Sequence, residues 1–152
     1  MSRFAQSLPI WLGAFLCFRS LEGRLGAKIV HLPAWAGWMA VVSAFPGFAL
    51  TWWARLYLGR NWSAAVTLKA EHALVRSGPY GLTRHPIYSG LLIAVLSTAI
   101  VRETVAALIG FALILLGLVL KLRQEEGFLH GKFGDAYDLY KQDVAALIPG
   151  LW

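Results

Sequence analysis

The residue types best suited to chemistry gather in one short segment, residues 77–90. Within it, Arg84 and His85 come directly before Pro86, and Tyr88 follows two residues later. Proline has no amide hydrogen and fits the first turn of a helix, so Pro86 predicts a helix start with His85 at or near its N-cap. An imidazole there lies beside free backbone N–H groups, which suit a carboxylate, a phosphate or the anionic end of a cofactor. A plain alternative is a loop entering a membrane helix, with Arg84 and His85 marking the water boundary.

The second candidate group is a pair of adjacent carboxylates, Glu125 and Glu126. Neighbouring residues on a helix point about 100° apart, so one carboxylate can face residues 77–90 while the other meets water or a cation. Carboxylates accept hydrogen bonds from ribose hydroxyls, and Tyr or His side chains can stack on a purine. A structural alternative pairs Glu125 with Lys121 and Glu126 with His130, at a helical i,i+4 spacing in each case. Surface ion pairs of that kind contribute little and need no function.

Familiar catalytic and metal-binding motifs are missing from the sequence. It has no G-x-S-x-G, no H-E-x-x-H, no P-loop and no strand-linked G-x-G-x-x-G. His72, His85 and Glu125 lack any recognised spacing of metal ligands, so no metal site is predicted. Cys17 is the single cysteine and lies in an apolar run, which favours a buried thiol acting as a small hydrophobe.

The composition is that of a membrane protein. Of the 152 residues, 58% are hydrophobic and only 14% are charged, against roughly 45–50% and about 25% in soluble proteins. The net charge of +6 would suit nucleic acid, but the basic residues lie at the ends of apolar segments, where they act as topology signals. The sequence therefore predicts an integral membrane protein among membrane lipids, without a nucleic-acid partner.

Four apolar segments supply the expected spans, at about 4–18, 33–58, 87–101 and 105–120. The first is short for a span, which needs about 17–25 residues. No A-x-A-like site follows it, so we expect a retained span rather than a signal peptide. The turn at residues 102–104 is so short that the last two segments must form an antiparallel hairpin. Gly110 and Gly117, one heptad apart, would allow close approach to another helix.

Polar sequence follows the second and the fourth apolar segments. In the tail, the aromatic and apolar residues recur at helical spacing, which predicts an amphipathic helix against the membrane or the domain. These tail residues are Phe133, Tyr137, Tyr140 and Val144. In the loop at 59–85, an extended pair of short segments is expected from Val66, Leu68, Leu74 and Val75.

The predicted fold is all-α: a polytopic integral membrane protein of about four transmembrane helices plus a C-terminal amphipathic helix, with no Rossmann-type domain. Residues 1–152 form one domain, with a two-helix part at 1–58 and a catalytic part at 59–152. With four spans, both termini, the 59–85 loop and the glutamate pair share one side. The other side has few of the 14 Lys and Arg, namely Arg19, Arg24, Lys28 and Arg102. The positive-inside rule therefore makes the shared side cytoplasmic.

Taken together, these motifs resemble those of the isoprenylcysteine carboxyl methyltransferase and phospholipid methyltransferase superfamily. The motifs are Gly78-Pro79-Tyr80, Arg84-His85-Pro86-Ile87-Tyr88-Ser89-Gly90, Glu125-Glu126, Phe133-Gly134-Asp135-Ala136-Tyr137, Tyr140 and Ile148-Pro149, with an apolar hairpin between the second and third. The resemblance covers roughly residues 59–152, and the first two segments match only in character. It implies an integral membrane enzyme that uses S-adenosylmethionine and yields S-adenosylhomocysteine. The cofactor would lie in a cytosol-facing pocket capped by the C-terminal segment.

The resemblance also implies roles for residues of this chain. The cofactor would be held by His72, Leu74, Val75, Gly78, Pro79, Tyr80, His85, Pro86, Tyr88, Glu125 and Glu126. The reacting centre would include Arg84, His85, Tyr88 and Glu125, and the acceptor would meet Arg55, Tyr137, Tyr140 and Asp143. Because a sulfonium is already an activated methyl donor, such a site has mainly to align the acceptor and exclude water.

The implied acceptor is a small hydrophobic or lipid-like molecule. In prenylcysteine-methylating relatives, an arginine after the Tyr-x-x-Tyr pair holds the substrate carboxylate, and Asp143 stands at that place here. Lys141 or Arg55 would have to replace that arginine, whereas an acidic residue suits the amine of a phospholipid headgroup better. A carboxylate needs no proton-transfer residue, whereas an amine or a thiol must lose a proton.

Two other classes of protein stay open at the level of sequence. One is an NADPH-dependent membrane oxidoreductase like the sterol reductases, which share the membrane architecture. The other is a non-enzymatic membrane protein that keeps the fold. The glutamate pair and the short polar loop favour the methyltransferase.

Overall fold

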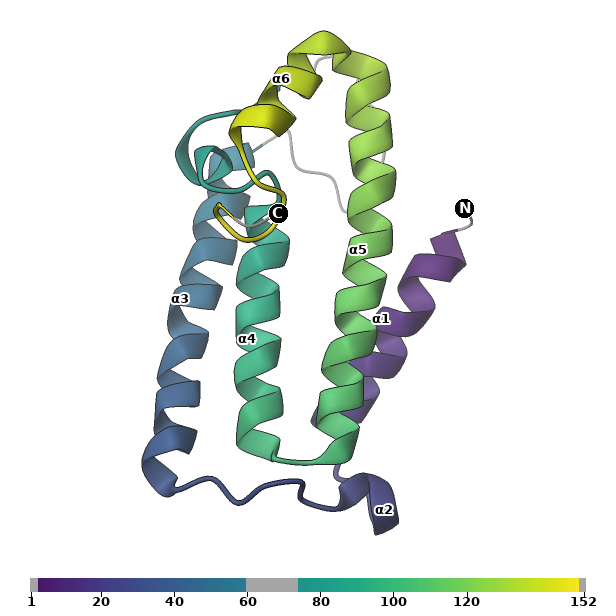
Figure 1. The fold of residues 1–152 in the computed structure, drawn as a ribbon, viewed down its shortest axis with the longest axis vertical. Helices are drawn as coiled ribbons and strands as arrows, with labels where there is room; N and C mark the ends of the chain where they lie inside the picture. Colours follow the sequence, from purple (N-terminus) through teal and green to yellow (C-terminus); the bar gives the residue numbers. More distant parts are fainter. Residues whose placement is uncertain (1–2, 60–73, 151–152) are drawn as a thin grey trace.

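The computed structural model describes residues 3–59 and 74–150, and in these ranges the chain is helical (Figure 1). The elements are α1 (Arg3–Phe18), α2 (Gly23–Gly26), α3 (Ala34–Leu58), η2 (Gly78–Gly81), α4 (Pro86–Arg102), α5 (Val105–Phe133) and α6 (Asp135–Asp143). The described part has no strand, only an isolated antiparallel bridge between Lys28 and Thr104. The all-α prediction is confirmed. Val66, Leu68 and His72 lie outside the described residues, so the expected extended pair stays a prediction.

The four apolar segments of the sequence correspond to α1, α3, α4 and α5. Helices α3 and α5, of 25 and 29 residues, are long and apolar enough to cross a membrane. Helices α1 and α4 are apolar but shorter, so four complete crossings stay a prediction. Helix α5 continues well past Leu120 because residues 121–126 are good helix formers. It ends at Gly134, whose φ of +50° favours glycine, and α6 begins directly after it.

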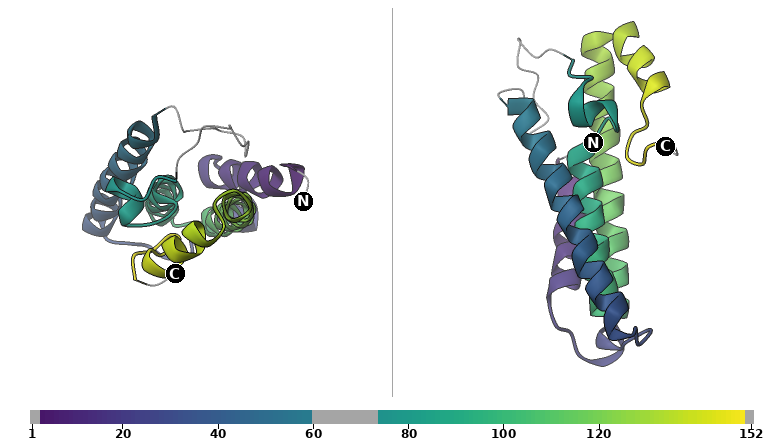
Figure 2. Two further views of the ribbon diagram at one scale, coloured as in Figure 1. Left: turned by 90° about the horizontal axis from the view of Figure 1, so that it is seen from above. Right: turned by 90° about the vertical axis from the view of Figure 1, so that its left-hand side faces the viewer.

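The long helices pack as two tight pairs, α3 with α4 and α1 with α5. Seen from above, α3 and α1 lie at the two outer positions, with α4 and α5 between them (Figure 2). Glycines set both contacts: a Cβ on Gly110 would lie 2.6 Å from the carbonyl oxygen of Gly13, and a Cβ on Gly90 would lie 2.4 Å from that of Gly47. The predicted close approach at Gly110 and Gly117 is confirmed, and the partner helix is α1.

The two ends of the bundle differ in character. At the lower end in Figure 1 lie α2 and the α4–α5 turn, where the carboxylate of Glu103 accepts hydrogen bonds from Lys28 Nζ at 2.8 Å and from the Leu32 amide at 2.9 Å. At the upper end lie η2, the start of α4, the end of α5, and α6. Between them is an apolar core of Cys17, Val95, Ile114 and Leu118. The segments expected to carry chemistry therefore share one end.

Candidate functional site

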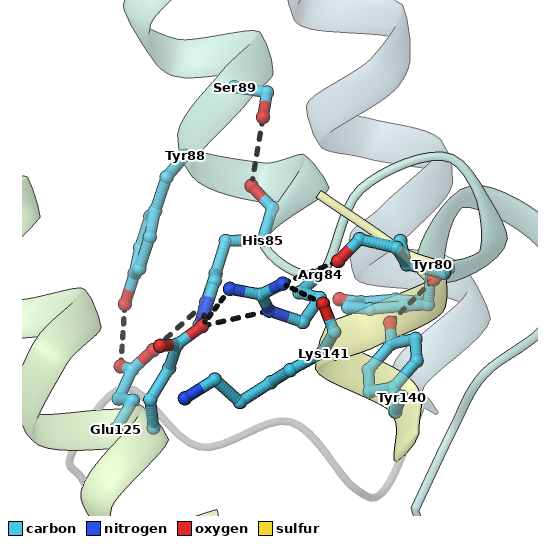
Figure 3. Close-up of polar contacts among 10 residues, drawn as sticks. Tyr80, Arg84, His85, Tyr88, Ser89, Glu125, Tyr140 and Lys141 are labelled. Atoms are coloured by element: carbon cyan, nitrogen blue, oxygen red, sulfur yellow. Dashed lines mark hydrogen bonds and ion pairs between the residues drawn. The ribbon is translucent and has the colours of Figure 1, made fainter. Parts of the chain in front are cut away.

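The start of α4 provides the histidine and the first tyrosine of the site. Helix α4 begins at Pro86 with His85 as its N-cap, as predicted, but the imidazole makes no capping hydrogen bond. The His85 ring instead stacks on the Tyr88 ring, with centroids 5.6 Å apart and planes 3° from parallel. Both side chains point toward Glu125 on α5 (Figure 3). The histidine is 7% exposed and so is largely shielded from water.

The glutamate pair on α5 contacts the side chains of His85, Tyr88 and Arg84. Tyr88 donates its hydroxyl hydrogen to Glu125 Oε1 at 2.5 Å, and His85 Nδ1 lies 3.6 Å from Glu125 Oε2. Arg84 holds Glu126 through Nε at 2.8 Å and a terminal nitrogen at 2.7 Å, both to Oε1. With side chains only 10% and 16% exposed, Arg84 and Glu126 form a shielded ion pair.

The structural alternative for the glutamates is wrong. Glu126 pairs with Arg84, whereas His130 pairs with Asp138 at 3.1 Å on the exposed corner between α5 and α6. Lys121 forms no ion pair among the described residues. It places Nζ 5.4 Å from the centroid of the Tyr88 ring instead. The side chains that converge here come from two different helices, which a purely surface pairing along α5 would not require.

The segment after α6, residues 144–147, closes the site from the other side. Its backbone carbonyls accept hydrogen bonds from the amides of Arg84 at 2.8 Å and His85 at 3.0 Å. Leu147 O accepts from the Ser89 hydroxyl at 2.6 Å, and the Arg84 guanidinium donates to Val144 O and Lys141 O. Ala146 and Leu147 of this segment form a small apolar cluster with Leu122 of α5. These contacts hold the 144–147 segment against the start of α4, and the role in capping a cofactor pocket that the family resemblance implies stays a prediction.

Three tyrosines form the wall nearest α6. Tyr140 donates its hydroxyl hydrogen to Tyr80 O (Figure 3), and Tyr80 donates to Ala54 O at 3.4 Å. Tyr137 is fully buried, edge-on to Tyr140. Burial raises the pKa of Tyr80 and of Tyr137 well above the ordinary value. Burial also raises the pKa of Tyr140, to about 12, against the opposing charges of Arg84 and Arg76. All three are neutral phenols at physiological pH.

Several polar atoms in the site are buried without a partner. Among the described residues, Thr83 Oγ1 has no hydrogen-bond partner, and His85 Nε2 and the Tyr137 hydroxyl face the Glu126 carboxylate without a close hydrogen bond. Thr83 is 2% exposed, and His85 Nε2 lies 3.5 Å from Glu126 Oε1. Buried polar groups are normally satisfied, so unpartnered atoms beside a part-exposed glutamate pair fit a site that receives a polar ligand. Within the described part of the chain, no group of three His, Cys, Asp or Glu residues converges to hold a metal ion.

Some predicted site residues lie at the edge of this network or outside it. The Asp143 carboxylate is 69% exposed and accepts a hydrogen bond from Arg76 at 3.1 Å. Arg55 donates to Gly59 O at 3.4 Å. The segment before Arg84 is mixed: Leu74 and Val75 are half-buried, Pro79 and Pro86 are fully buried, and Gly78 has a φ of +60° and packs against Tyr57. His72 lies outside the described residues.

Three residues that contribute to the site or its surroundings were not predicted from the sequence. Thr83 lies inside the motif, but a threonine in a loop carries no signal of burial. Gln6 of α1 is buried and donates to Gln124, the residue before the glutamate pair. An amide inside an apolar segment is a signal that could have marked Gln6, because polar groups within a membrane are costly and rarely without a role. Ser89 was noted only as part of the motif.

The class that fold and site define is an all-helical, strongly apolar protein with a shielded charged site at one end of its bundle. A family model described as the isoprenylcysteine carboxyl methyltransferase (ICMT) family matches residues 38–131. The chain belongs to this family. The matched range contains the His85–Tyr88 and Glu125–Glu126 groups but neither α1 nor α6.

Curated relatives carry methyltransferase names. The chain is similar to protein-S-isoprenylcysteine O-methyltransferase of Schizosaccharomyces pombe, with 32% identity over 63% of this chain and 42% of the relative. It is similar to protein-S-isoprenylcysteine O-methyltransferase B of Arabidopsis thaliana, with 28% identity over 74% and 68%. It is also similar to methanethiol S-methyltransferase of Pseudomonas deceptionensis, with 29% identity over 93% and 53%. The chain spans less than half the length of the yeast relative.

Proposed function

We propose that this chain is an S-adenosylmethionine-dependent methyltransferase that acts on a hydrophobic or lipid-like acceptor at the cytosolic face of a membrane. The observation that carries the proposal is the convergence of Arg84, His85 and Tyr88 from one helix start on Glu125 and Glu126 of another helix. Membership of the isoprenylcysteine carboxyl methyltransferase family supports the reaction type.

The residues present fit such a cofactor. Glu125 and Glu126, with side chains 23% and 16% exposed, would accept hydrogen bonds from the ribose hydroxyls. Thr83 Oγ1, which lacks a partner, and His85 Nε2 and the Tyr137 hydroxyl, which make no close hydrogen bond, would satisfy the remaining polar atoms. The η2 turn, Leu74 and Val75 would line the approach on the side of α3. The proposed set of binding residues is the one that the family resemblance implies.

When bound, S-adenosylmethionine supplies a methyl group on a sulfonium, an already activated donor. The protein's tasks are then positioning and the exclusion of water. The Arg84–Glu126 ion pair and the 144–147 segment fix the start of α4, because the Arg84 guanidinium donates to Glu126 and to Val144 O at once. The Tyr88 hydroxyl fixes one oxygen of Glu125. The buried tyrosine wall keeps water from the side of α6.

A prenylcysteine carboxylate is the acceptor that the comparisons favour. Two of the relatives named above act on S-isoprenylcysteine according to their names. The Asp143 carboxylate that suggested an amine-bearing acceptor is 69% exposed and pairs with Arg76 at 3.1 Å, which weakens the reason to expect such an acceptor. A carboxylate acceptor also fits a site in which no group is committed to removing a proton from the nucleophile.

A small thiol is the second candidate acceptor. The methanethiol S-methyltransferase of Pseudomonas deceptionensis aligns with 93% of this chain, a larger share than the family model, which matches residues 38–131. A thiol must lose a proton before or during transfer. The Glu125 carboxylate, which accepts the Tyr88 hydroxyl hydrogen, is the nearest group suited to receive it.

We further propose four membrane crossings, with both termini and the site on the cytosolic side. Helices α3 and α5 meet the length and composition expected of spans, and the shorter α1 and α4 lie alongside them. The excess of Lys and Arg on the side of the site supports this orientation. Residues 1–152 would then act as one domain.

Calorimetry of the purified chain in detergent tests the cofactor. We expect S-adenosylmethionine and S-adenosylhomocysteine to bind in the micromolar range, and NADPH to give no signal. Binding of NADPH alone would make the chain an oxidoreductase, and silence with all three ligands would leave a non-enzymatic protein with this fold. Glu125→Gln and His85→Ala should weaken binding while the purified fold stays intact. Membranes given a labelled methyl donor would then identify the acceptor from the labelled product.

A further inference from the structure

Lys121 stands at the boundary between the apolar and polar parts of α5. It is the first charged residue after the apolar run 105–120 and comes one helical turn before Glu125. Residues four apart on a helix share a face, so Lys121 lies on the side of the glutamate pair, one turn closer to the membrane interior. Its side chain is half-buried. A molecule that enters the site from the bilayer therefore reaches the Lys121 ammonium before it reaches the glutamates.

The contacts of Lys121 distinguish it from the other cations of the site. Arg84 is paired with Glu126, and Arg76 is paired with Asp143. Lys141, on α6 and drawn in Figure 3, is a further cation of the site, but it is exposed, whereas Lys121 is half-buried. Lys121 has no carboxylate within ion-pair distance in the described parts of the chain, and its Nζ lies 5.4 Å over the Tyr88 ring. An aromatic face holds an ammonium in place without neutralising it. The charge is thus positioned beside Tyr88 and Glu125 and remains available to an anion.

We propose that Lys121 binds the carboxylate of the methyl acceptor and selects for acceptors that carry one. This proposal rests on the proposed methyltransferase function and names its acceptor class: a carboxylate attached to an apolar group. In transfer, a carboxylate oxygen attacks the methyl carbon, and the new O–CH3 bond forms as the S–CH3 bond breaks. The electron pair goes to sulfur, which leaves a neutral thioether and a methyl ester, and no proton moves. Lys121 would then be the cation that holds the acceptor carboxylate, in place of Lys141 or Arg55.

The cofactor also has a carboxylate. The position of Lys121 along α5 favours the acceptor carboxylate over the cofactor carboxylate as its ligand. The polar cofactor approaches from the water side, where Thr83, His85 and Tyr137 leave polar atoms without a close hydrogen bond. An acceptor with an apolar tail keeps that tail among the spans and can bring its carboxylate only to the end of the apolar run. Lys121 lies at that level, whereas the glutamate pair lies one turn beyond it.

The test compares Lys121→Gln with Lys121→Arg and with Lys132→Gln in the full chain in detergent. Lys132 is a matched control, because its Nζ also lies 5.4 Å over an aromatic ring, that of Phe133, but at the far end of α5. The acceptor probe is N-acetyl-S-farnesylcysteine, with its carboxamide as a competitor that lacks the charge. Calorimetry with S-adenosylhomocysteine reports the cofactor separately.

We expect Lys121→Gln to raise the KM for the free acid by about tenfold to a hundredfold, the effect of one lost charged hydrogen bond. The preference for acid over amide should vanish, Lys121→Arg should restore it, and Lys132→Gln should leave it unchanged. The dissociation constant of S-adenosylhomocysteine should stay the same in all variants. A purely structural role for Lys121 would not change the preference between acid and amide.

Three results would overturn the proposal. Weakened S-adenosylhomocysteine binding with an unchanged acid KM would assign Lys121 to the cofactor's carboxylate. If Lys121→Gln kept the preference for the acid, Lys121 would not bind the acceptor carboxylate, and its contact with the Tyr88 ring would be its remaining role. A wild-type protein that binds S-adenosylhomocysteine but methylates methanethiol and not the acid would keep the proposed function and remove this inference. Absence of S-adenosylhomocysteine binding in the wild type would instead contradict the proposed function itself.

Discussion

Helix α5 is held by its two neighbours in different ways. Against α1, the contact is backbone on backbone: a Cβ at Gly110 would lie 2.6 Å from Gly13 O and 2.7 Å from Cys17 Sγ. Against the start of α4, it is made by charged and hydroxyl side chains, with Tyr88 bound to Glu125 and Arg84 to Glu126. Backbone atoms cannot rearrange, whereas polar side chains can exchange one partner for another. The first contact therefore maintains the fold, and the second can respond to a ligand.

The largest expected effect comes from breaking the glycine contact. Gly110→Leu places a side chain where the α1 backbone already lies, so α1 must separate from α5. Overpacking of this kind typically costs about 1–3 kcal/mol, and more where backbone must move. Gly127→Leu is the control on the same helix, because a Cβ at Gly127 meets nothing within 4 Å. Thermal unfolding in detergent should show a large loss for the first variant and little change for the second; equal behaviour would mean that the α1–α5 contact is not tight.

A smaller effect on stability, with a larger one on binding, is expected from Glu126→Ala. Arg84 then keeps only backbone carbonyls as partners, which should cost about 1–3 kcal/mol of unfolding free energy. If Glu126 also contacts the cofactor, S-adenosylhomocysteine affinity should fall by at least about tenfold. Asp138→Ala, which removes an exposed pair with His130, should cost about 0–1 kcal/mol and leave affinity unchanged. Normal affinity in a destabilised Glu126→Ala would restrict that residue to a structural role.

The smallest expected effect is a loss of stability at alkaline pH. Burial raises the pKa of Tyr80, Tyr137 and Tyr140 in the folded protein, to about 12 for Tyr140. A folded-state pKa above the unfolded value of about 10 gives stability that is complete below pH 10 and is lost as the pH rises through the folded pKa. The melting temperature should therefore fall between about pH 10 and 12. Tyr140→Phe should be slightly less stable at pH 8, having lost its bond to Tyr80 O, and should lose less on going to high pH. An identical alkaline slope in both proteins would contradict this account.

Sequence reasoning succeeded where the signal is local or depends on a single residue type. Apolar runs located four helices, Pro86 located the start of α4, and Gly110 located the close approach to another helix. The meeting of Tyr88 with Glu125 was also predictable, because both lie at the same end of an antiparallel hairpin. These are consequences of periodicity and backbone chemistry, which a sequence carries directly.

The rest of the site depends on choices between partners that a sequence does not encode. Glu126 has a histidine, His130, four residues away, yet it pairs with Arg84, which is distant in the chain. The hydrogen bonds from Arg84 and His85 to residues 145 and 146 involve backbone carbonyls, which every residue has. The pairing of Asp143 with Arg76 weakened the main reason to expect an amine-bearing acceptor. In each case the decision lies in three-dimensional packing rather than in residue type.

The ties at Glu103 limit how the bundle can move. Lys28 and Leu32 join the segment leading into α3 to the α4–α5 turn, so the two helix pairs are fastened together at the end away from the site. Any relative motion of α3–α4 against α1–α5 must then pivot there and have its greatest amplitude at the other end. Glu125 lies 20 residues after Val105, the first residue of α5, so the pivot and the glutamate pair are separated by about 30 Å at 1.5 Å per residue. A substitution at Glu103 would thus act at a distance, by releasing a hinge at the opposite end of the bundle.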